Sequence, residues 1–312
     1  MLVIFWTKLR KDQIISLMIT KKIKSKKKIF ISGSGGFIGK HLKISLKKNY
    51  TLLTPTKNTL NLKNDNKLNS YLKTKKPDII IHLAGSTKFK QNKKLEKKNQ
   101  HINTFITTIN LANNINPECQ LIVFFGSIAE YGNIKTPFLE NSKLNPLSYY
   151  GKYKSKSYYF IKKILDKKKL NYVWVRPSLA YGAGDNNDRF LGYILNSIKK
   201  NKSFTISPGN QIRDYIHISD LCKIVVLIIL NYKKIYRCRL NLSSQNYIMI
   251  KKIPSMIEKI IKKKLNYILN KSLNNEVNLL NSNKKLLNFF PKLKFINFKK
   301  GLTKTLKDES II

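Results

Sequence analysis

The sequence Lys28-Ile-Phe-Ile-Ser-Gly-Ser-Gly-Gly-Phe-Ile-Gly-Lys40 joins a short apolar run to three glycines spaced three residues apart. The apolar residues predict a buried strand, and the glycines predict a sharp turn from that strand into a helix. Such a turn suits a dinucleotide pyrophosphate. The first glycine permits the tight turn, the second lets the backbone approach the phosphates, and the third lets the helix pack against the strand. The N-terminal amides of the helix would point at the anion. The predicted contacts are Gly33, Gly36, Phe37, Ile38 and Gly39.

Length and composition indicate a globular protein. A chain of 312 residues with 42% apolar residues can bury a full core, in one large domain or two modest ones. Its three cysteines are far apart and odd in number, which favours reduced thiols in a cytoplasmic protein over a disulfide framework. The four histidines form no ligand cluster with the cysteines, so we expect no metal site.

The chain is strongly basic, with 61 Lys and Arg against 16 Asp and Glu and a formal net charge of +45. Such a charge would ordinarily suggest nucleic acid or an anionic membrane as a partner. However, lysine is spread over the whole chain together with asparagine and isoleucine, all encoded by A/T-rich codons, and arginine is scarce. We therefore attribute the charge to genome composition and expect neither partner. A positive field would still favour a nucleotide diphosphate.

Residues 1–27 begin Met-Leu-Val-Ile-Phe-Trp and soon become rich in lysine. The apolar run is too short to span a bilayer, and no small-residue cleavage site follows it. We interpret residues 1–27 as a basic N-terminal extension without ordered structure.

The end of the second predicted strand, residues 50–54, bears on the choice of cofactor. A fold that prefers NAD usually places an acidic residue here, against the ribose hydroxyls. This chain reads Thr54-Pro-Thr-Lys57 instead. With no carboxylate to repel a 2′-phosphate and with Lys57 nearby, the site favours NADP(H), with NAD(H) as the alternative. Lys57 could also be one more solvated lysine.

Residues 77–85 form a near-continuous apolar run that ends in small residues. This pattern is typical of a central parallel strand whose carboxyl end meets a ligand, so we predict that Leu83, Ala84 and Gly85 lie against the cofactor. His82 could act as a base, but we favour a structural histidine that is hydrogen-bonded within the fold.

A predicted amphipathic helix over residues 99–114 and a core strand over residues 120–125 follow. Alternating strands and helices at this spacing predict an α/β fold with a doubly wound parallel sheet.

After the predicted strand over residues 120–125, the chain contains three residues whose types and spacing suit proton transfer. Ser127 lies at the carboxyl end of that strand, and Tyr150 and Lys154 share one face of a helix because they are four residues apart. A free phenol has a pKa of about 10, and a neighbouring ammonium or an oxidised nicotinamide would lower it. Tyr150 could then exchange a proton with a carbinol oxygen while hydride passes to or from a cofactor. Ser127 would hydrogen-bond the same oxygen.

Together these motifs resemble the extended short-chain dehydrogenase/reductase family, in its NAD(P)-dependent nucleotide-sugar epimerase, dehydratase and reductase branch. Residues 33–39 resemble its glycine loop, and Ser127 resembles its active-site Ser/Thr. Tyr150 and Lys154 resemble its Tyr-x-x-x-Lys pair, in which the lysine also contacts the nicotinamide ribose, so both residues are expected to contact the cofactor. The resemblance covers nearly everything from Lys28 to about Leu306, including residues 176–185, 209–220 and 241–243.

The resemblance implies a Rossmann domain over residues 28–180 that binds NAD(P). A smaller C-terminal portion, residues 181–312, would mainly bind the substrate, with residues 213–242 returning to the Rossmann domain. The implied substrate is a nucleotide-diphosphate sugar. Members of the family are usually dimers, so we expect a homodimer.

The resemblance also assigns single residues. Asn61 and Leu62 would meet the adenine, and Pro177 would lie in the carboxamide loop. Arg213 would bind the substrate diphosphate, because a guanidinium can make two parallel charged hydrogen bonds.

Departures from the family pattern narrow the reaction. The 4,6-dehydratases carry Asp-Glu or a similar acid directly after the active-site Thr, whereas Ile128 and Ala129 follow Ser127 here, which argues against dehydration. Glu130 comes one position too late. We interpret it as structural, or as a feature shared with 4-keto-sugar reductases that have Glu before Tyr-Gly.

Two further departures leave the substrate open. An asparagine that many members use near the sugar diphosphate is Leu179 here, and the usual second C-terminal arginine is not evident near Glu276. We favour an NADPH-dependent reductase of a nucleotide-linked 4-keto-6-deoxy sugar, as in cell-envelope polysaccharide synthesis. A nucleotide-sugar C4 epimerase is the alternative. A remote alternative is a dinucleotide- or RNA-binding protein that has lost catalysis.

Overall fold

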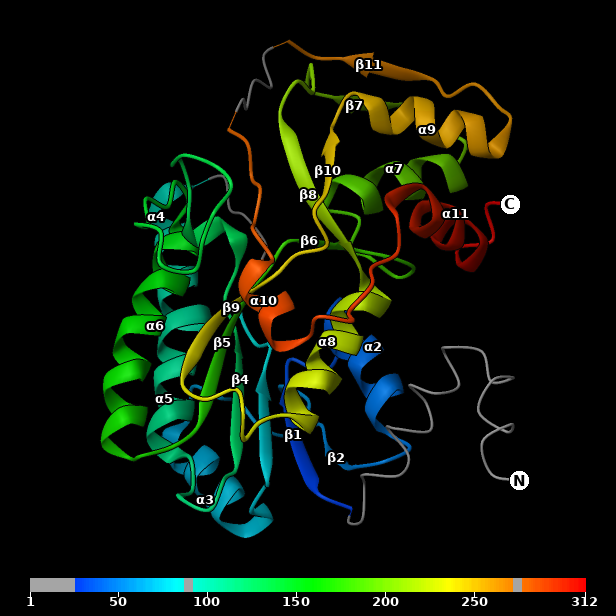
Figure 1. The fold of residues 1–312 in the computed structure, drawn as a ribbon. Coiled ribbons are helices and arrows are strands. Elements are labelled where there is room, and N and C mark those ends of the chain that lie inside the picture. Colours follow the sequence, from blue (N-terminus) through cyan, green and yellow to red (C-terminus); the bar gives the residue numbers. More distant parts are fainter. Residues whose placement is uncertain (1–25, 87–91, 272–276) are drawn as a thin grey trace, which may run out of the picture.

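A computed structural model describes residues 26–86, 92–271 and 277–312, so the extension predicted over residues 1–27 lies almost entirely outside the described residues. The largest feature is a sheet of six parallel strands in the order β2-β1-β3-β4-β5-β9 (Figure 1). These strands are β1 (Lys28–Ser32), β2 (Thr51–Leu53), β3 (Ile79–His82), β4 (Leu121–Phe125), β5 (Tyr172–Pro177) and β9 (Cys238–Leu242). The continuous apolar runs predicted as central strands are buried along their whole length in β3 and β4.

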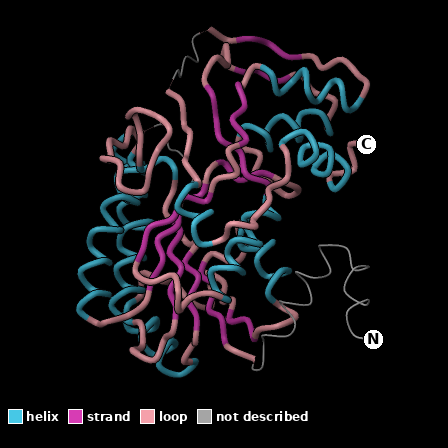
Figure 2. The backbone as a smooth tube through the Cα atoms, in the orientation of Figure 1, coloured by secondary structure: helices cyan, strands magenta, loops and turns pink. Residues whose placement is uncertain are grey.

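Helices cover both faces of this sheet. On one face, α2 (Phe37–Leu46) and α8 (Ile218–Leu230) pack together over a core that includes Leu42 and Val225. The opposite face is covered by α3 (Asp65–Lys75), α5 (Thr107–Asn114) and α6 (Tyr149–Lys167). Figure 2 shows the strands lying between these two layers of helices. The predicted doubly wound parallel sheet is confirmed.

One predicted helix differs from the structure. In place of a continuous helix over residues 99–114, α4 (Lys93–Gln100) is followed by a π-helical turn over residues 101–106 and then by α5. α4 begins early because the Asn92 side chain accepts a hydrogen bond from the Leu95 amide and so caps the helix. Its first turns are rich in lysine, so they carry no apolar periodicity to reveal them.

A smaller portion of the chain lies beyond the carboxyl ends of the sheet strands (Figure 1). It contains a sheet in the order β10-β8-β6 and a two-stranded sheet of β7 and β11. Its core includes Phe298 and Leu302. Its elements are β6 (Leu179–Tyr181), α7 (Phe190–Lys199), β7 (Phe204–Ile206), β8 (Ile212–His217), β10 (Asn246–Met249), α9 (Lys252–Ile261), β11 (Tyr267–Leu269) and α11 (Phe298–Asp308).

The chain passes between the two portions several times. β8 pairs with β6 and β10 in the smaller portion, whereas the next two elements, α8 and β9, belong to the six-stranded sheet and its covering layer. α10 (Lys284–Phe289) also packs against β9, before α11 returns to the smaller portion. Within the described residues, no helix is both long and apolar enough to cross a bilayer.

The strand order reverses at β1, which has β2 on one side and β3 on the other. Such a reversal opens a crevice at the carboxyl ends of parallel strands, where ligands bind in this class of fold.

Two glycines shape the turn that follows β1 at this crevice. Gly33 has a φ of +72°, and a Cβ on it would lie 2.8 Å from the Ala84 amide nitrogen. A Cβ on Gly39 would lie 2.6 Å from the Gly33 carbonyl oxygen. The backbone therefore needs glycine at both positions.

Candidate active site

The start of α2 forms the part of the crevice best suited to an anion. Gly36 is the N-cap of this helix and offers no side chain, and the first turn contains no acidic residue. A Cβ on Gly36 would have only the Gly33 carbonyl oxygen within 4 Å, at 3.4 Å, so the space beside this glycine is otherwise open. Helix N-termini bind phosphates through their amides and their dipole. The residues here therefore fit a dinucleotide pyrophosphate.

Ser127 follows β4 directly and begins a short 3₁₀ turn over residues 128–130. Its Oγ accepts a hydrogen bond from the Ala129 amide at 3.2 Å, and its own amide donates to Glu130 Oε1 at 2.8 Å. This reciprocal arrangement is a capping box. It fixes the Ser127 backbone at the carboxyl end of the sheet, where the crevice opens.

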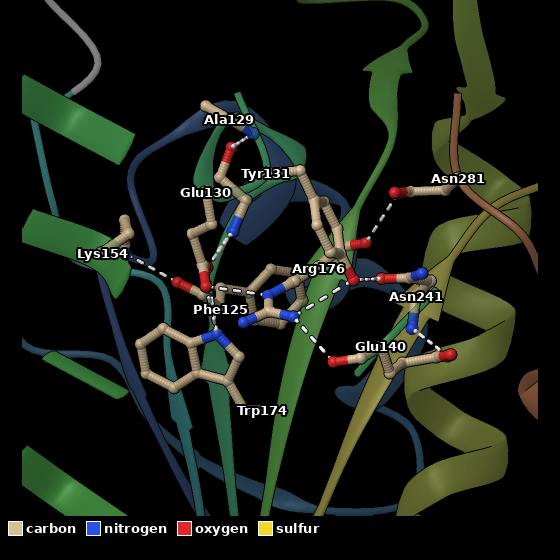
Figure 3. A network of polar contacts seen from close by, with 11 residues as sticks. Phe125, Ala129, Glu130, Tyr131, Glu140, Lys154, Trp174, Arg176, Asn241 and Asn281 are labelled. Atoms are coloured by element: carbon tan, nitrogen blue, oxygen red, sulfur yellow. Dashed lines mark hydrogen bonds and ion pairs between the residues drawn. The ribbon is translucent and has the colours of Figure 1, made fainter. Parts of the chain in front are cut away.

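α6 brings Tyr150 and Lys154 to Ser127. The helix starts where the Ser148 side chain accepts a hydrogen bond from the Gly151 amide at 3.1 Å. One turn later Lys154 is 2% exposed, and its Nζ donates to the Phe125 carbonyl oxygen at 2.6 Å (Figure 3). The same Nζ lies 5.9 Å from the centroid of the Tyr150 ring. The Tyr150 side chain is hydrogen-bonded to that of Ser127. The structure thus brings the three predicted residues together.

The ionisation of this group differs from the expectation. Burial raises the pKa of Tyr150 to about 12, and the hydrogen bond with Ser127 offsets only part of that effect. Burial also lowers the pKa of Lys154 to about 8, while the negative charge of Glu130 acts in the opposite direction. The expectation that the pKa of Tyr150 lies below 10 is therefore wrong for the chain alone, because desolvation of the phenolate is the largest effect on it. Tyr150 is in its acid form at neutral pH.

A network of buried charges and hydrogen bonds surrounds Glu130 (Figure 3). Glu130 Oε2 pairs with Arg176 Nε at 2.8 Å, and Glu130 Oε1 accepts from Trp174 Nε1 at 3.0 Å. Arg176 Nη1 donates to the Tyr131 hydroxyl at 3.1 Å, and that hydroxyl donates to Asn241 Oδ1 at 2.7 Å. Because the side chains of Glu130 and Arg176 are both 0% exposed, the structure favours the structural interpretation of Glu130.

His82 lies at the end of β3, beneath the crevice, and is a structural residue as expected. Its Nδ1 is 2.7 Å from Ser32 Oγ, and its Nε2 is 3.0 Å from Thr108 Oγ1. Burial and, to a smaller extent, the charge of Lys154 lower its pKa to about 3. The ring is therefore neutral and fully bonded within the fold, which excludes it as a base in the physiological range.

Leu83, Ala84 and Gly85 follow His82 at the edge of the crevice. The Leu83 amide donates to the Ser32 carbonyl oxygen at 3.1 Å, which continues the strand pairing by one residue. A Cβ on Gly85 would lie 3.4 Å from Lys154 Nζ. The β3 end, predicted to meet the cofactor, thus adjoins the candidate proton-transfer group.

The other predicted cofactor contacts lie around the sheet edge. Lys57 is exposed in the loop after β2, and Asn61 is partly exposed further along that loop. Leu62 is buried in the core between the sheet and α3. Pro177 is the buried last residue of β5.

Arg213, the predicted diphosphate ligand, belongs to β8 and is 8% exposed. Its Nη1 donates to the carbonyl oxygens of Ile212 and Val277. Among the described residues, no group of His, Cys, Asp and Glu side chains is arranged to hold a metal ion.

Comparisons with known proteins identify the family of the chain and support its fold. The model of the NAD dependent epimerase/dehydratase family matches residues 29–242. GDP-6-deoxy-D-talose 4-dehydrogenase of Aggregatibacter actinomycetemcomitans is 29% identical over 212 residues, which cover 65% of this chain and 70% of that protein. A putative UDP-glucose 4-epimerase of Methanocaldococcus jannaschii is 30% identical over 227 residues, which cover 66% of this chain and 74% of that protein. The solved structure of RMD from Pseudomonas aeruginosa complexed with NADPH superposes with a TM-score of 0.82 at 19% identity, covering 92% of this chain and 100% of that one.

The neutral state of His82 predicts a pH dependence of stability. Its pKa is about 3 in the folded chain against an ordinary value of 6.5, so the unfolded chain binds a proton that the folded chain rejects. The stabilisation is complete above about pH 6.5 and is lost as the pH falls toward 3. When the pH is lowered from about 7.5 to about 5.5, protonation of this ring in the unfolded chain should reduce the free energy of unfolding by about 1 kcal/mol.

Denaturant unfolding of the wild type and of His82→Asn at both pH values checks this prediction. Burial also lowers the pKa of His217, to about 4. The contribution of His217 to the pH dependence is the same in both proteins, so it cancels in the comparison. The variant should lose about 1 kcal/mol less than the wild type on acidification. An identical loss in the two proteins would contradict the assignment.

Proposed function

Because the chain belongs to the NAD dependent epimerase/dehydratase family, we propose that it reduces a nucleotide-linked 4-keto-6-deoxy sugar, with NADPH as the reductant. The family expected from the motifs is confirmed, and with it an enzyme of nucleotide-sugar chemistry that uses a nicotinamide dinucleotide. The observation that carries the finer proposal is the grouping of Ser127, Tyr150 and the buried Lys154 at the carboxyl end of β4, beside a cofactor loop without an acidic residue. Reduction of a ketone needs a proton donor at this position.

The three side chains have separate roles in this proposal. The carbonyl oxygen of the sugar accepts hydrogen bonds from Ser127 and Tyr150. The nicotinamide, when bound, supplies the hydride to the carbonyl carbon and leaves oxidised. Tyr150 gives its proton to the oxygen that becomes the alcohol, and the ammonium of Lys154 stabilises the phenolate that remains. Because Lys154 is fixed to the Phe125 carbonyl oxygen, its charge needs no rearrangement during the reaction.

The residues around Ser127 do not support a dehydratase. The 4,6-dehydratases that the motifs resemble carry an acid directly after the active-site Thr, where this chain has Ile128 and Ala129. Glu130, the nearest carboxylate in sequence, is buried in its ion pair with Arg176 and cannot reach a substrate.

A C4 epimerase remains the second candidate, favoured by the 30% identity with the putative UDP-glucose 4-epimerase. It would use the same three residues, but it must begin by removing a proton from a hydroxyl group, so it needs Tyr150 as a base. The absence of an acidic residue from the loop after β2, where a fold that keeps NAD usually has one, is the feature that favours the reductase. The relative from Aggregatibacter actinomycetemcomitans is named as a 4-dehydrogenase, and that name describes a redox reaction at the same sugar carbon.

The preference for NADPH rests on the loop after β2. No Asp or Glu occurs from Thr51 to Asn64, and Lys57 is exposed there. A 2′-phosphate would therefore meet an ammonium and hydroxyl groups, and no carboxylate would repel it. Arg213 remains our candidate for the substrate diphosphate, because its guanidinium is the one that the family pattern assigns to that group.

The cofactor preference can be measured directly. We expect NADPH to bind more tightly than NADH, and Lys57→Ala should weaken NADPH binding about three- to tenfold, or about 0.7–1.4 kcal/mol, without changing NADH binding. Lys48→Ala is the matched control, because Lys48 is equally exposed but precedes β2 at the opposite end of the strand. Fluorescence titration of both cofactors suffices. NADH binding as tight as NADPH binding in the wild type would refute the preference.

The proton donor can be tested by removing one oxygen atom. Tyr150→Phe should bind NADPH normally but lose turnover by about a hundred- to ten-thousand-fold, the usual contribution of a general acid. Tyr149→Phe is the control, since the Tyr149 ring packs near Lys152 and no contact joins it to Ser127 in the described residues.

Turnover is measured with GDP-, dTDP- and CDP-linked 4-keto-6-deoxy sugars by NADPH absorbance. If Tyr150→Phe keeps more than about a tenth of the wild-type rate, Tyr150 is not the proton donor. Full activity in both variants would overturn the mechanism.

A further inference from the structure

The Glu130 carboxylate accepts hydrogen bonds from three different residues. Its Oε1 accepts hydrogen bonds from the Ser127 amide at 2.8 Å and from Trp174 Nε1 at 3.0 Å. Its Oε2 accepts a hydrogen bond from Arg176 Nε at 2.8 Å. A Cβ on Gly126 would collide with both Glu130 Oε1 and the Trp174 indole, so a side chain at residue 126 would displace the carboxylate. The group is held from three sides, and one of its three donors is the backbone of Ser127.

Arg176 is itself held in place from further away. Its Nη1 contacts the Tyr131 hydroxyl at 3.1 Å and the Glu140 carbonyl oxygen at 3.3 Å, and its guanidinium lies 4.7 Å from the centroid of the Tyr131 ring. The Tyr131 hydroxyl is bonded in turn to Asn241 on β9 (Figure 3). The position of Glu130 is therefore set by strands β5 and β9 and not by its own short turn alone.

Stability does not account for this arrangement. Removing two charges from water offsets most of their attraction, and apolar side chains of similar volume are often at least as stabilising. In addition, Arg176 Nη2 is buried without a hydrogen-bond partner among the described residues, which costs free energy. An apolar pair could fill the same space, but it could not accept a hydrogen bond from the Ser127 amide.

We propose that Glu130, fixed by Arg176 and Trp174, is a positioning residue for Ser127, so that its carboxylate is needed for the chemical step and not for ligand binding. This inference rests on the proposed function. The three hydrogen bonds fix the Ser127 backbone, and the capping box then leaves the Ser127 hydroxyl beside Tyr150, where both can meet one carbonyl oxygen. Glu130 does not touch the substrate in this role.

Glu130→Gln tests the role with the smallest change in shape. All three groups that face the carboxylate are donors, whereas an amide offers one acceptor oxygen and one NH₂ group. Either orientation of the amide therefore places an NH₂ group against a donor. In one orientation the Ser127 amide loses its acceptor, and in the other the contact with Arg176 that fixes the side chain is lost. We expect kcat to fall about 30- to 100-fold, less than the hundred- to thousand-fold known for the loss of one preorganised donor, because the Ser127 hydroxyl itself remains, while KM and the Kd of NADPH change less than threefold.

Glu140→Gln is the matched control. Glu140 is also buried in this network, but its Oε1 accepts from the backbone amide of Asn241 at 2.9 Å, on β9 and not at Ser127 (Figure 3). It should keep kcat within about threefold of the wild type. An equal loss of kcat in the two variants, or a normal kcat in Glu130→Gln, would overturn the inference. Absence of turnover in the wild type would instead overturn the proposed function, and the inference with it.

Two further variants separate positioning from folding. The double variant Glu130→Met with Arg176→Met removes both charges, so it should regain the Tm that Glu130→Met alone loses but not the kcat. Recovery of kcat together with Tm would overturn the inference. The chain has two tryptophans, so in a Trp6→Phe background the emission of Trp174 shows whether each variant keeps its buried indole.

Discussion

The hydrogen bond from Lys154 to the Phe125 carbonyl oxygen is the contact on which the site depends. It ties the first turns of α6 to the carboxyl end of β4, at 2.6 Å and almost without exposure to water. A buried ammonium that lost this acceptor would be strongly destabilised, so the helix cannot slide along the sheet. With α6 held in this register, Tyr150 meets Ser127, and the end of β3 at Gly85 comes up against Lys154. One contact thus joins the cofactor side of the crevice to the proton-transfer side.

Local sequence patterns predicted most of the fold and the central residues of the site. The apolar runs at β3 and β4 are buried along their whole length, and the glycines at residues 33 and 39 lie where a Cβ would collide with the backbone. Tyr150 and Lys154 share a helix face because their separation is one helical turn. Such features depend on a few neighbouring residues, so their spacing is visible in the sequence alone.

Long-range burial was not visible in the same way. Glu130 and Arg176 are 46 residues apart, and Tyr131 and Asn241 are 110 apart, so no local pattern marks these pairs. The pKa of Tyr150 was predicted in the wrong direction for the same reason: the charge of Lys154 can be inferred from spacing, but the desolvation that outweighs it depends on the packed structure. The signal that existed was Glu130 itself, an acidic residue beside a core strand in a chain with few acids.

The central claim is that the chain reduces a sugar ketone and does not invert a sugar alcohol. The most direct measurement follows deuterium from NADPH labelled at C4 of the nicotinamide, with a nucleotide-linked 4-keto-6-deoxy sugar as the substrate. Mass spectrometry should find one deuterium atom at the former carbonyl carbon of the sugar, with one NADP⁺ formed for each product molecule. No deuterium in the sugar and no oxidation of NADPH, together with inversion at C4 when a nucleotide sugar with a C4 hydroxyl group is offered instead, would contradict this account and identify an epimerase.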